Sequence, residues 1–288
     1  MEEFFKYLSN TNSQQTFLTL KSKIENYERE IQKKYLDFSE KDIINFFKKH
    51  YNNKKPATVC NAITMIRKLF NFYNKNLDFL KIQFLKDNGL NVSVQEYFSP
   101  SELKELTDSL QNAQDQALVM LIYNGLYDND FQTIRNLKKD FIYEIQDSKF
   151  KISPYLEGIL FDASLEEFNY NLEGKTYDLN DTDYLFRGRI SKNKGPLSSV
   201  TLKKRLKLMS DYLGIEDFTA IKIKHSRTIY DIVKYENIIG RDLKRNEIRD
   251  FLIMKDIKAS VEQIEFRKKK CKEKMLKDIK DEKDYYLG

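Results

Sequence analysis

Apolar residues recur at helical spacing through the first quarter of the chain, between residues 11 and 75. Intervals of three and four residues place side chains on one face of a helix, so this region predicts a small helical bundle. Pro56 precedes the last run, where a proline fits the first turn of a helix. The three runs are Phe17, Leu20, Ile24 and Tyr27; Ile43, Ile44 and Phe47; and Val59, Ile63, Ile66, Phe70 and Tyr73.

The helical spacing fades between residues 76 and 97, a segment that contains the turn signal Asn88-Gly89. Directly afterwards, Ser99-Pro100-Ser101-Glu102 has the pattern of a capping box with proline at the first helical position. We therefore expect a boundary between residues 85 and 97. It separates a domain of residues 1–90 from a domain of residues 91–288.

Helical patterns also dominate the second region. The exception is residues 140–162, where the short stretches Phe141–Tyr143 and Phe150–Ile152 favour a hairpin or a small sheet. The expected fold is therefore mainly α, with a small β-sheet in the second domain. The helical patterns cover residues 103–110, 117–123, 199–213, 224–237 and 246–254, and a highly charged one begins at Val261.

Composition narrows the classes of protein. The chain has 50 basic and 44 acidic residues, so a nucleic-acid surface would depend on where the cations lie rather than on their total. The 41% of hydrophobic residues is enough for two cores. The two cysteines and two histidines lack metal-ligand spacing, and neither a signal segment nor a membrane-spanning run of about 18 apolar residues is evident. We expect a cytoplasmic protein with no metal, cofactor or membrane partner.

A basic loop leads into a serine-capped helix between residues 187 and 206. Hydroxyls and cations fill the first two turns that follow Ser199. Backbone N–H groups at a helix amino terminus bind phosphate, and the following side chains can enter a groove of DNA. The alternative is a solvated helix face, which is common for a run of charges.

An ordered series of motifs resembles the tyrosine recombinase (phage integrase) family. The bundle that contains Pro56, Thr58, Asn61 and Arg67–Phe70 is similar to that family's core-binding domain. The resemblance implies a helical core-binding (SAM-like) domain, followed by a mostly helical catalytic-type domain with a small sheet. The further motifs are Phe98–Leu103, Gln116–Leu118, Tyr123–Leu126, Asp183–Phe186, Pro196–Ser198, Leu202–Leu206, Leu213–Ile215, and Lys224–Ser226 through to Ile232.

The residues that would cut DNA in that family are absent from the matching positions. Tyr127 follows Gly125-Leu126 where the family has its first arginine, and Ile221 and Lys224 stand for the histidine and arginine of the second box. Lysine keeps the charge but loses the bidentate fork of arginine. The third box reads Leu252-Ile253-Met254, the nucleophile position falls near Gln263, and the usual lysine-rich hairpin turn is missing, although Lys149 and Lys151 are nearby. We expect no enzymatic activity, because each such contact is worth several kcal/mol in the transition state.

The expected function is therefore sequence-specific binding of double-stranded DNA without cleavage, as in recombinase-like repressors that control lysogeny in temperate phages. A phage regulatory protein or a peptide-linked antirepressor is a further partner which that interpretation implies. The candidate DNA-binding residues are Lys54, Lys55, Thr58, Asn61, Arg67, Lys68, Tyr127, Arg187, Arg189, Lys192, Lys194, Ser198, Ser199, Thr201, Lys203, Lys204, Arg205, Lys222, Lys224, His225 and Arg227.

Two other hypotheses remain open on the sequence. The first is a divergent active recombinase in which Tyr285 or Tyr286 cuts in trans, which requires substitutes for the missing arginines. The second is an accessory protein that joins a recombination complex through its charged carboxy-terminal helix without selecting a DNA site. The sequence leaves the operator, the inducer and the oligomeric state undetermined.

Overall fold

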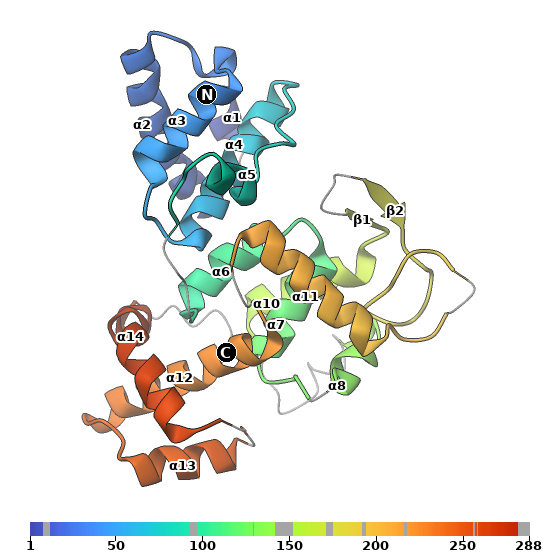
Figure 1. The fold of residues 1–288 in the computed structure, drawn as a ribbon. Helices are drawn as coiled ribbons and strands as arrows, with labels where there is room; N and C mark the ends of the chain where they lie inside the picture. The colour runs from blue at the N-terminus through green and yellow to red at the C-terminus, as the bar shows by residue number, and fades with distance from the viewer. Residues whose placement is uncertain are drawn as a thin grey trace. The chain divides into compact units, whose positions relative to one another are not determined.

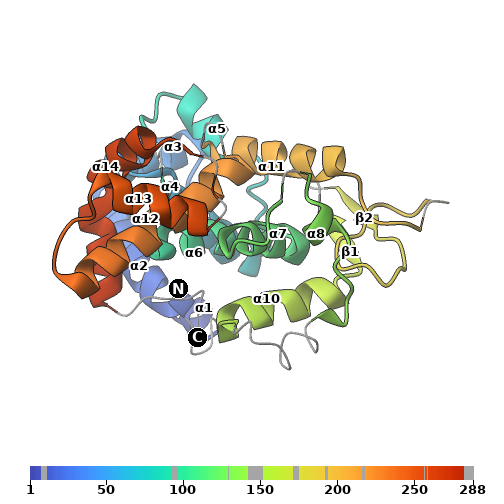
Figure 2. The ribbon, with the colours of Figure 1, turned by 90° about the horizontal axis from the view of Figure 1, so that it is seen from below.

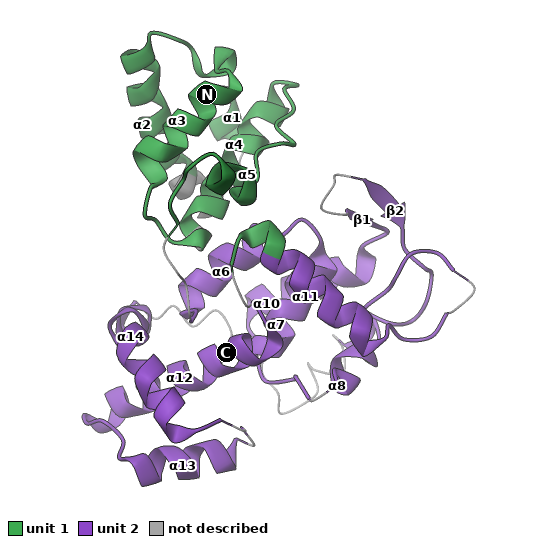
Figure 3. Cartoon of the chain, in the orientation of Figure 1, with its two compact units in different colours: residues 1–95, 211–215 green, residues 96–210, 216–288 purple. Residues whose placement is uncertain are grey.

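The computed structural model is mainly helical, with one small antiparallel sheet among the described residues (Figure 1). The structure describes residues 1–7, 12–92, 97–128, 130–141, 152–170, 175–191, 194–215, 218–255, 257 and 259–281. The chain divides into two compact units (Figure 3). Unit 1 comprises Met1–Gln95 and Asp211–Ile215, and unit 2 comprises Glu96–Ser210 and Glu216–Gly288.

Unit 1 is a helical bundle, as the spacing of apolar residues predicts. A capping box starts α3, where Ser39 accepts from the Asp42 N–H and the Asp42 carboxylate accepts from the Ser39 N–H. Pro56 lies in the first turn of α4. The elements are α1 (Glu2–Tyr7), α2 (Asn12–Ile31), the 3₁₀ turn η1 (Tyr35–Asp37), α3 (Glu40–Tyr51), α4 (Pro56–Phe72) and α5 (Ile82–Asp87).

Unit 2 is built around α7 (Ala113–Tyr123), in which every side chain from Ala117 to Tyr123 is fully buried. This helix packs against α10 (Pro154–Leu165) and α12 (Ala220–Ile239), and Figure 2 shows α10 alongside it. A helix that is apolar all round must be covered on all sides, so α7 fixes the elements around it. The other helices are α6 (Pro100–Asp108), α8 (Gln132–Arg135), α11 (Ser199–Leu213), α13 (Arg245–Met254) and α14 (Val261–Lys280).

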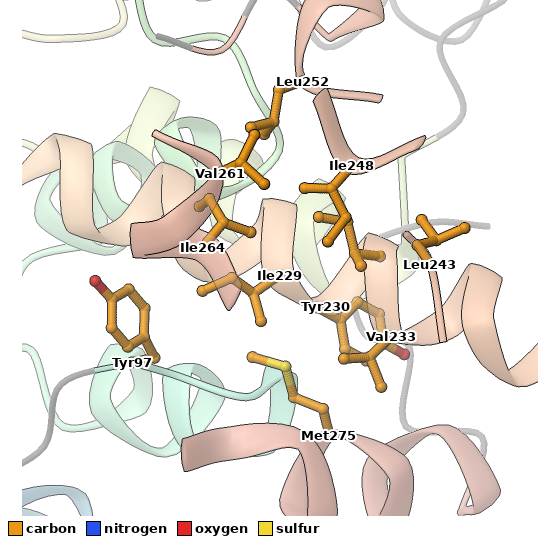
Figure 4. Packing of buried hydrophobic residues seen from close by; sticks show 11 residues of the cluster. Tyr97, Ile229, Tyr230, Val233, Leu243, Ile248, Leu252, Val261, Ile264 and Met275 are labelled. Carbon is orange, nitrogen blue, oxygen red and sulfur yellow. The ribbon is translucent and has the colours of Figure 1, made fainter. Parts of the chain in front are cut away.

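A separate apolar cluster joins α12, α13 and α14 (Figure 4). Ile229 and Val233 of α12 meet Ile248 of α13 and Ile264 of α14, and all four are fully buried. Sparse apolar positions in a highly charged helix are therefore enough to dock α14. We also find that no helix in the described part of the chain is long and apolar enough to cross a membrane.

The small sheet lies later in the chain than the sequence pattern predicts. Strands β1 (Phe168–Tyr170) and β2 (Thr176–Asp178) form it, with Phe168 opposite Asp178. Residues 154–162, where we expected part of a hairpin, belong to α10, so that prediction is wrong; residues 142–151 lie outside the described part. These residues form a helix and not a hairpin because Ser153 caps it, Pro154 fits its first turn, and its apolar residues face α7.

Candidate nucleic-acid interface

Two long segments of the chain contain many basic residues and no acidic one. Acidic residues occur on average about once in every six or seven positions of the whole chain, yet none lies in residues 43–77 or 184–210. A polyanion is attracted by such a segment even when the whole molecule is nearly balanced in charge. The basic residues are Lys48, Lys49, Lys54, Lys55, Arg67, Lys68 and Lys75 in the first segment, and Arg187, Arg189, Lys192, Lys194, Lys203, Lys204, Arg205 and Lys207 in the second.

In unit 1, the first segment includes α4. The predicted contact residues lie on one face of this helix and just before its first turn. Thr58 and Lys68 are exposed and Asn61 is half-buried, and their spacing of three and seven residues places them on one face of the helix. Lys54 and Lys55 are exposed immediately before its first turn.

Arg67 points away from this face. Its guanidinium donates to the Asp78 carboxylate at 3.1 Å and also lies beside the Tyr212 hydroxyl, so its charge is used within unit 1. We therefore leave Arg67 out of the interface.

In unit 2, the second segment forms a basic loop and the first turns of α11. The Ser198 hydroxyl accepts from the Thr201 N–H at 3.1 Å and lies 2.9 Å from the Thr201 hydroxyl, which gives the helix the serine cap that the sequence predicts. Lys204 is exposed, and Lys203 is exposed with Asp130 at 3.5 Å. An ion pair between such exposed side chains is weak and leaves Lys203 available.

Most of the remaining loop residues lie in the described part of the chain. Arg189, Lys194 and Ser198 are exposed, and Ser199 and Thr201 are half-buried. Lys192 lies outside the described residues. These residues therefore present cations and hydroxyl groups next to the amino terminus of α11, where the helix dipole also favours an anion.

Arg187 and Arg205 have a structural role, because both guanidinium groups are buried. Arg187 donates to the carbonyl oxygens of Ala163 at 3.0 Å and Ser164 at 3.2 Å, which neutralises the carboxyl end of α10. Arg205 donates to the Gln114 side chain at 3.2 Å and to the Arg187 carbonyl at 2.7 Å. Their exposed fractions are 6% and 9%, so neither can serve as a DNA contact.

The residues that align with the second recombinase box lie on α12, and the side chains of His225 and Arg227 there are buried. Lys222 and Lys224 are half-buried. Arg227 is 7% exposed, its Nε donates to Asp231 at 2.8 Å, and its guanidinium lies over the Tyr123 and Tyr230 rings. We therefore assign Arg227 to the core of unit 2.

His225 is also buried, and its ring is neutral near pH 7. Burial lowers the pKa of this imidazole to about 4, with further lowering by the positive charges of Arg267 and Lys224. Its Nδ1 lies 3.0 Å from an Nη of Arg267 on α14. The sequence does not indicate that Arg267 contacts His225, since the two residues lie 42 positions apart.

The structure also places several other residues that align with the recombinase motifs. Tyr127 is half-buried and packs edge-on against Phe131, with ring centroids 4.8 Å apart. Leu252 is buried in the cluster of α12, α13 and α14, while Gln263 is exposed on α14. Lys149, Lys151, Tyr285 and Tyr286 lie outside the described residues.

The charged carboxy-terminal helix docks on its own chain. Lys268 pairs with the buried carboxylate of Glu236, and Lys274 pairs with Glu102. Asp278 accepts from the Ser101 backbone N–H at 3.0 Å and from its hydroxyl at 2.8 Å, which caps α6. Much of the charge of α14 is thus used inside unit 2.

Comparisons with known proteins give a likeness to solved structures. No family model and no curated protein matches the chain. The crystal structure of XerA recombinase is similar with a TM-score of 0.33 and 14% sequence identity, over 90% of this chain and 98% of that one. A likeness this weak does not establish a family.

Proposed function

We propose that this protein binds double-stranded DNA at specific sites and does not cut it. The observation that carries the proposal is the pair of acid-free basic segments, one centred on α4 and one on the loop and first turns of α11. Phosphate contacts by exposed lysines release condensed counterions, which supplies affinity. Thr58 and Asn61, on the same face of α4 as Lys68, supply the hydroxyl and amide groups that read base edges.

The absence of cleavage is inferred from the residues at the positions matching the recombinase boxes. Tyr127, Lys224, Leu252 and Gln263 replace the first arginine, the second arginine, the third box and the nucleophile. Lys224 retains a charge that can bind a phosphate, but one lysine does not reproduce two arginine forks and a tyrosine nucleophile. The chemistry of the site therefore favours binding over strand transfer.

Within this function, we infer a repressor that controls lysogeny in a temperate phage or prophage. The inference rests on the resemblance of the ordered motifs to inactivated recombinase-like regulators such as the SPβ-type master repressor. A phage regulatory protein or a peptide-linked antirepressor would then relieve the repression. The accessory-protein hypothesis is weaker, because α14, on which it depended, uses Lys268, Lys274 and Asp278 within unit 2.

The test starts with selection of bound duplexes from a random pool, followed by affinity measurements at several salt concentrations. Lys54→Ala and Lys68→Ala in unit 1, and Lys204→Ala in unit 2, should each lower the slope of log K against log salt by about 0.9, since each removes one phosphate contact. Lys41→Ala is the matched control, because Lys41 is exposed on α3 outside the basic segments.

The outcomes separate the parts of the proposal. If the three variants behave like the Lys41→Ala control, the DNA surface lies elsewhere. If only the unit 2 variant changes the slope, unit 1 makes no phosphate contact. Nicked or religated products, or a covalent adduct on a suicide substrate, would refute the non-catalytic assignment.

A further inference from the structure

The face of α10 that points away from α7 is apolar and exposed. Its exposed residues are Pro154, Gly158, Phe161 and Leu165. Their spacing of four, three and four residues places them in one stripe along the helix. Phe161 is 50% exposed and Leu165 is 61% exposed. A helix that is apolar all round is normally covered on all sides, so this stripe has the composition of a contact surface.

Gly158 lies in the middle of the stripe, where a glycine weakens the helix. The fold of the described chain does not require it. Its backbone is that of an ordinary α-helix rather than left-handed. A Cβ placed there would meet no atom of the described residues within 4 Å, apart from its chain neighbours and the backbone of α10. A glycine on a helix surface lets a second backbone approach closely, which accounts for its presence in an apolar stripe.

The charge around the stripe is negative. No lysine, arginine or histidine occurs in residues 152–170, although basic residues occur about once in six positions of the whole chain. Asp162 and Glu167 are both exposed. Of the cations on neighbouring segments, Arg187 is buried and Lys104 pairs with a carboxylate of its own helix. A positively charged partner is therefore attracted to this face, whereas DNA, an anionic membrane and a second copy of the same face are repelled.

We propose that the exposed stripe of α10 binds an amphipathic helix of a partner protein. The apolar side of that helix packs on Phe161 and Leu165, its backbone passes close to Gly158, and its lysine or arginine side chains lie beside Asp162. Figure 2 shows α7 between α10 and α11, so the stripe and the basic segment at α11 lie on opposite sides of unit 2. The partner can thus be bound whether or not α11 is occupied.

The test uses a displayed library of helix-forming peptides as the probe. The peptides have leucine at helical spacing and lysine, glutamate, glutamine or serine at the other positions. We expect the full-length protein to enrich peptides with lysine beside the leucine stripe. Leu165→Ser should weaken binding of the enriched peptide about tenfold in fluorescence anisotropy, since a leucine that becomes buried contributes roughly that factor to affinity. Ile253→Ser is the matched control, because Ile253 is 70% exposed near the end of α13.

Gly158→Ala separates docking from folding. Alanine strengthens the helix, so unit 2 should melt at or above the wild-type temperature, whereas the added methyl group blocks the closest approach and should weaken the peptide. A library that yields no binder, a binder without a lysine preference, or wild-type affinity for both Leu165→Ser and Gly158→Ala would overturn the proposal. A dimer in sedimentation experiments that Leu165→Ser abolishes would assign the stripe to a second copy of the chain instead.

Discussion

The buried imidazole of His225 makes a quantitative prediction about acid stability. Its pKa is about 4 in the folded protein and about 6.5 in an unfolded chain, because burial and two nearby cations disfavour the charged ring. Between these values the unfolded chain binds a proton that the folded chain does not. The free energy of unfolding therefore falls as pH falls from about 6.5 to about 4, and this loss is absent above 6.5.

The size of the effect follows from the difference between the two pKa values. It amounts to about 3 kcal/mol across the whole window, since each pKa unit corresponds to about 1.4 kcal/mol. His225→Gln removes the titrating ring and retains an acceptor for Arg267. The variant should therefore lose about 3 kcal/mol less than the wild type on acidification from pH 7 to pH 4.

The assay is urea unfolding followed by the helical circular dichroism signal at several pH values between 4 and 7.5. The chain has a second histidine, His50, whose pKa is also lowered by burial, so His50→Gln is the control for histidine removal in general. Contributions of the carboxylates cancel when each variant is compared with the wild type at one pH. Parallel curves for the wild type and His225→Gln would refute the assignment of a low pKa to His225.

Two further predictions concern buried charges of unit 2. Glu236→Ala should lower the free energy of unfolding by about 3–5 kcal/mol, because it leaves the buried Lys268 ammonium unpaired. The double variant Glu236→Leu/Lys268→Met should recover most of that loss in the same urea assay. A double variant as unstable as Glu236→Ala would contradict this prediction. Arg187→Ala should lower the melting temperature by removing hydrogen bonds to the carboxyl end of α10 and leave the salt slope of DNA binding unchanged. A reduced slope at wild-type stability would return Arg187 to the DNA surface.

The long helices are predictable from sequence because their signals are local. The apolar spacing of α4, its Pro56 start, and the capping box of α6 at Ser99 each depend on neighbouring residues, and each appears where the pattern indicates. The sheet was misplaced because its position depends on a distant side chain. Asn112 accepts from the Tyr170 N–H at 2.8 Å and donates to the Tyr170 carbonyl oxygen at 3.0 Å, which holds β1 from 58 positions away.

The candidate site was predictable only as a region of charge. A sequence shows that Arg187, Arg205 and Lys204 belong to one basic segment, but it does not show which of them is buried. Arg205 is turned inward because Gln114, 91 positions earlier, accepts from it. The acid-free lengths of residues 43–77 and 184–210, by contrast, could be read from the sequence without any structure.

The contact between Asp278 and Ser101 also constrains when unit 2 can fold. These residues lie 177 positions apart, so joining them in a flexible chain costs about 4–5 kcal/mol of loop-closure entropy. During synthesis α6 emerges from the ribosome long before α14, and until then water must satisfy the Ser101 N–H. Contacts of such long sequence separation slow folding, so unit 2 should mature only after α14 has left the ribosome.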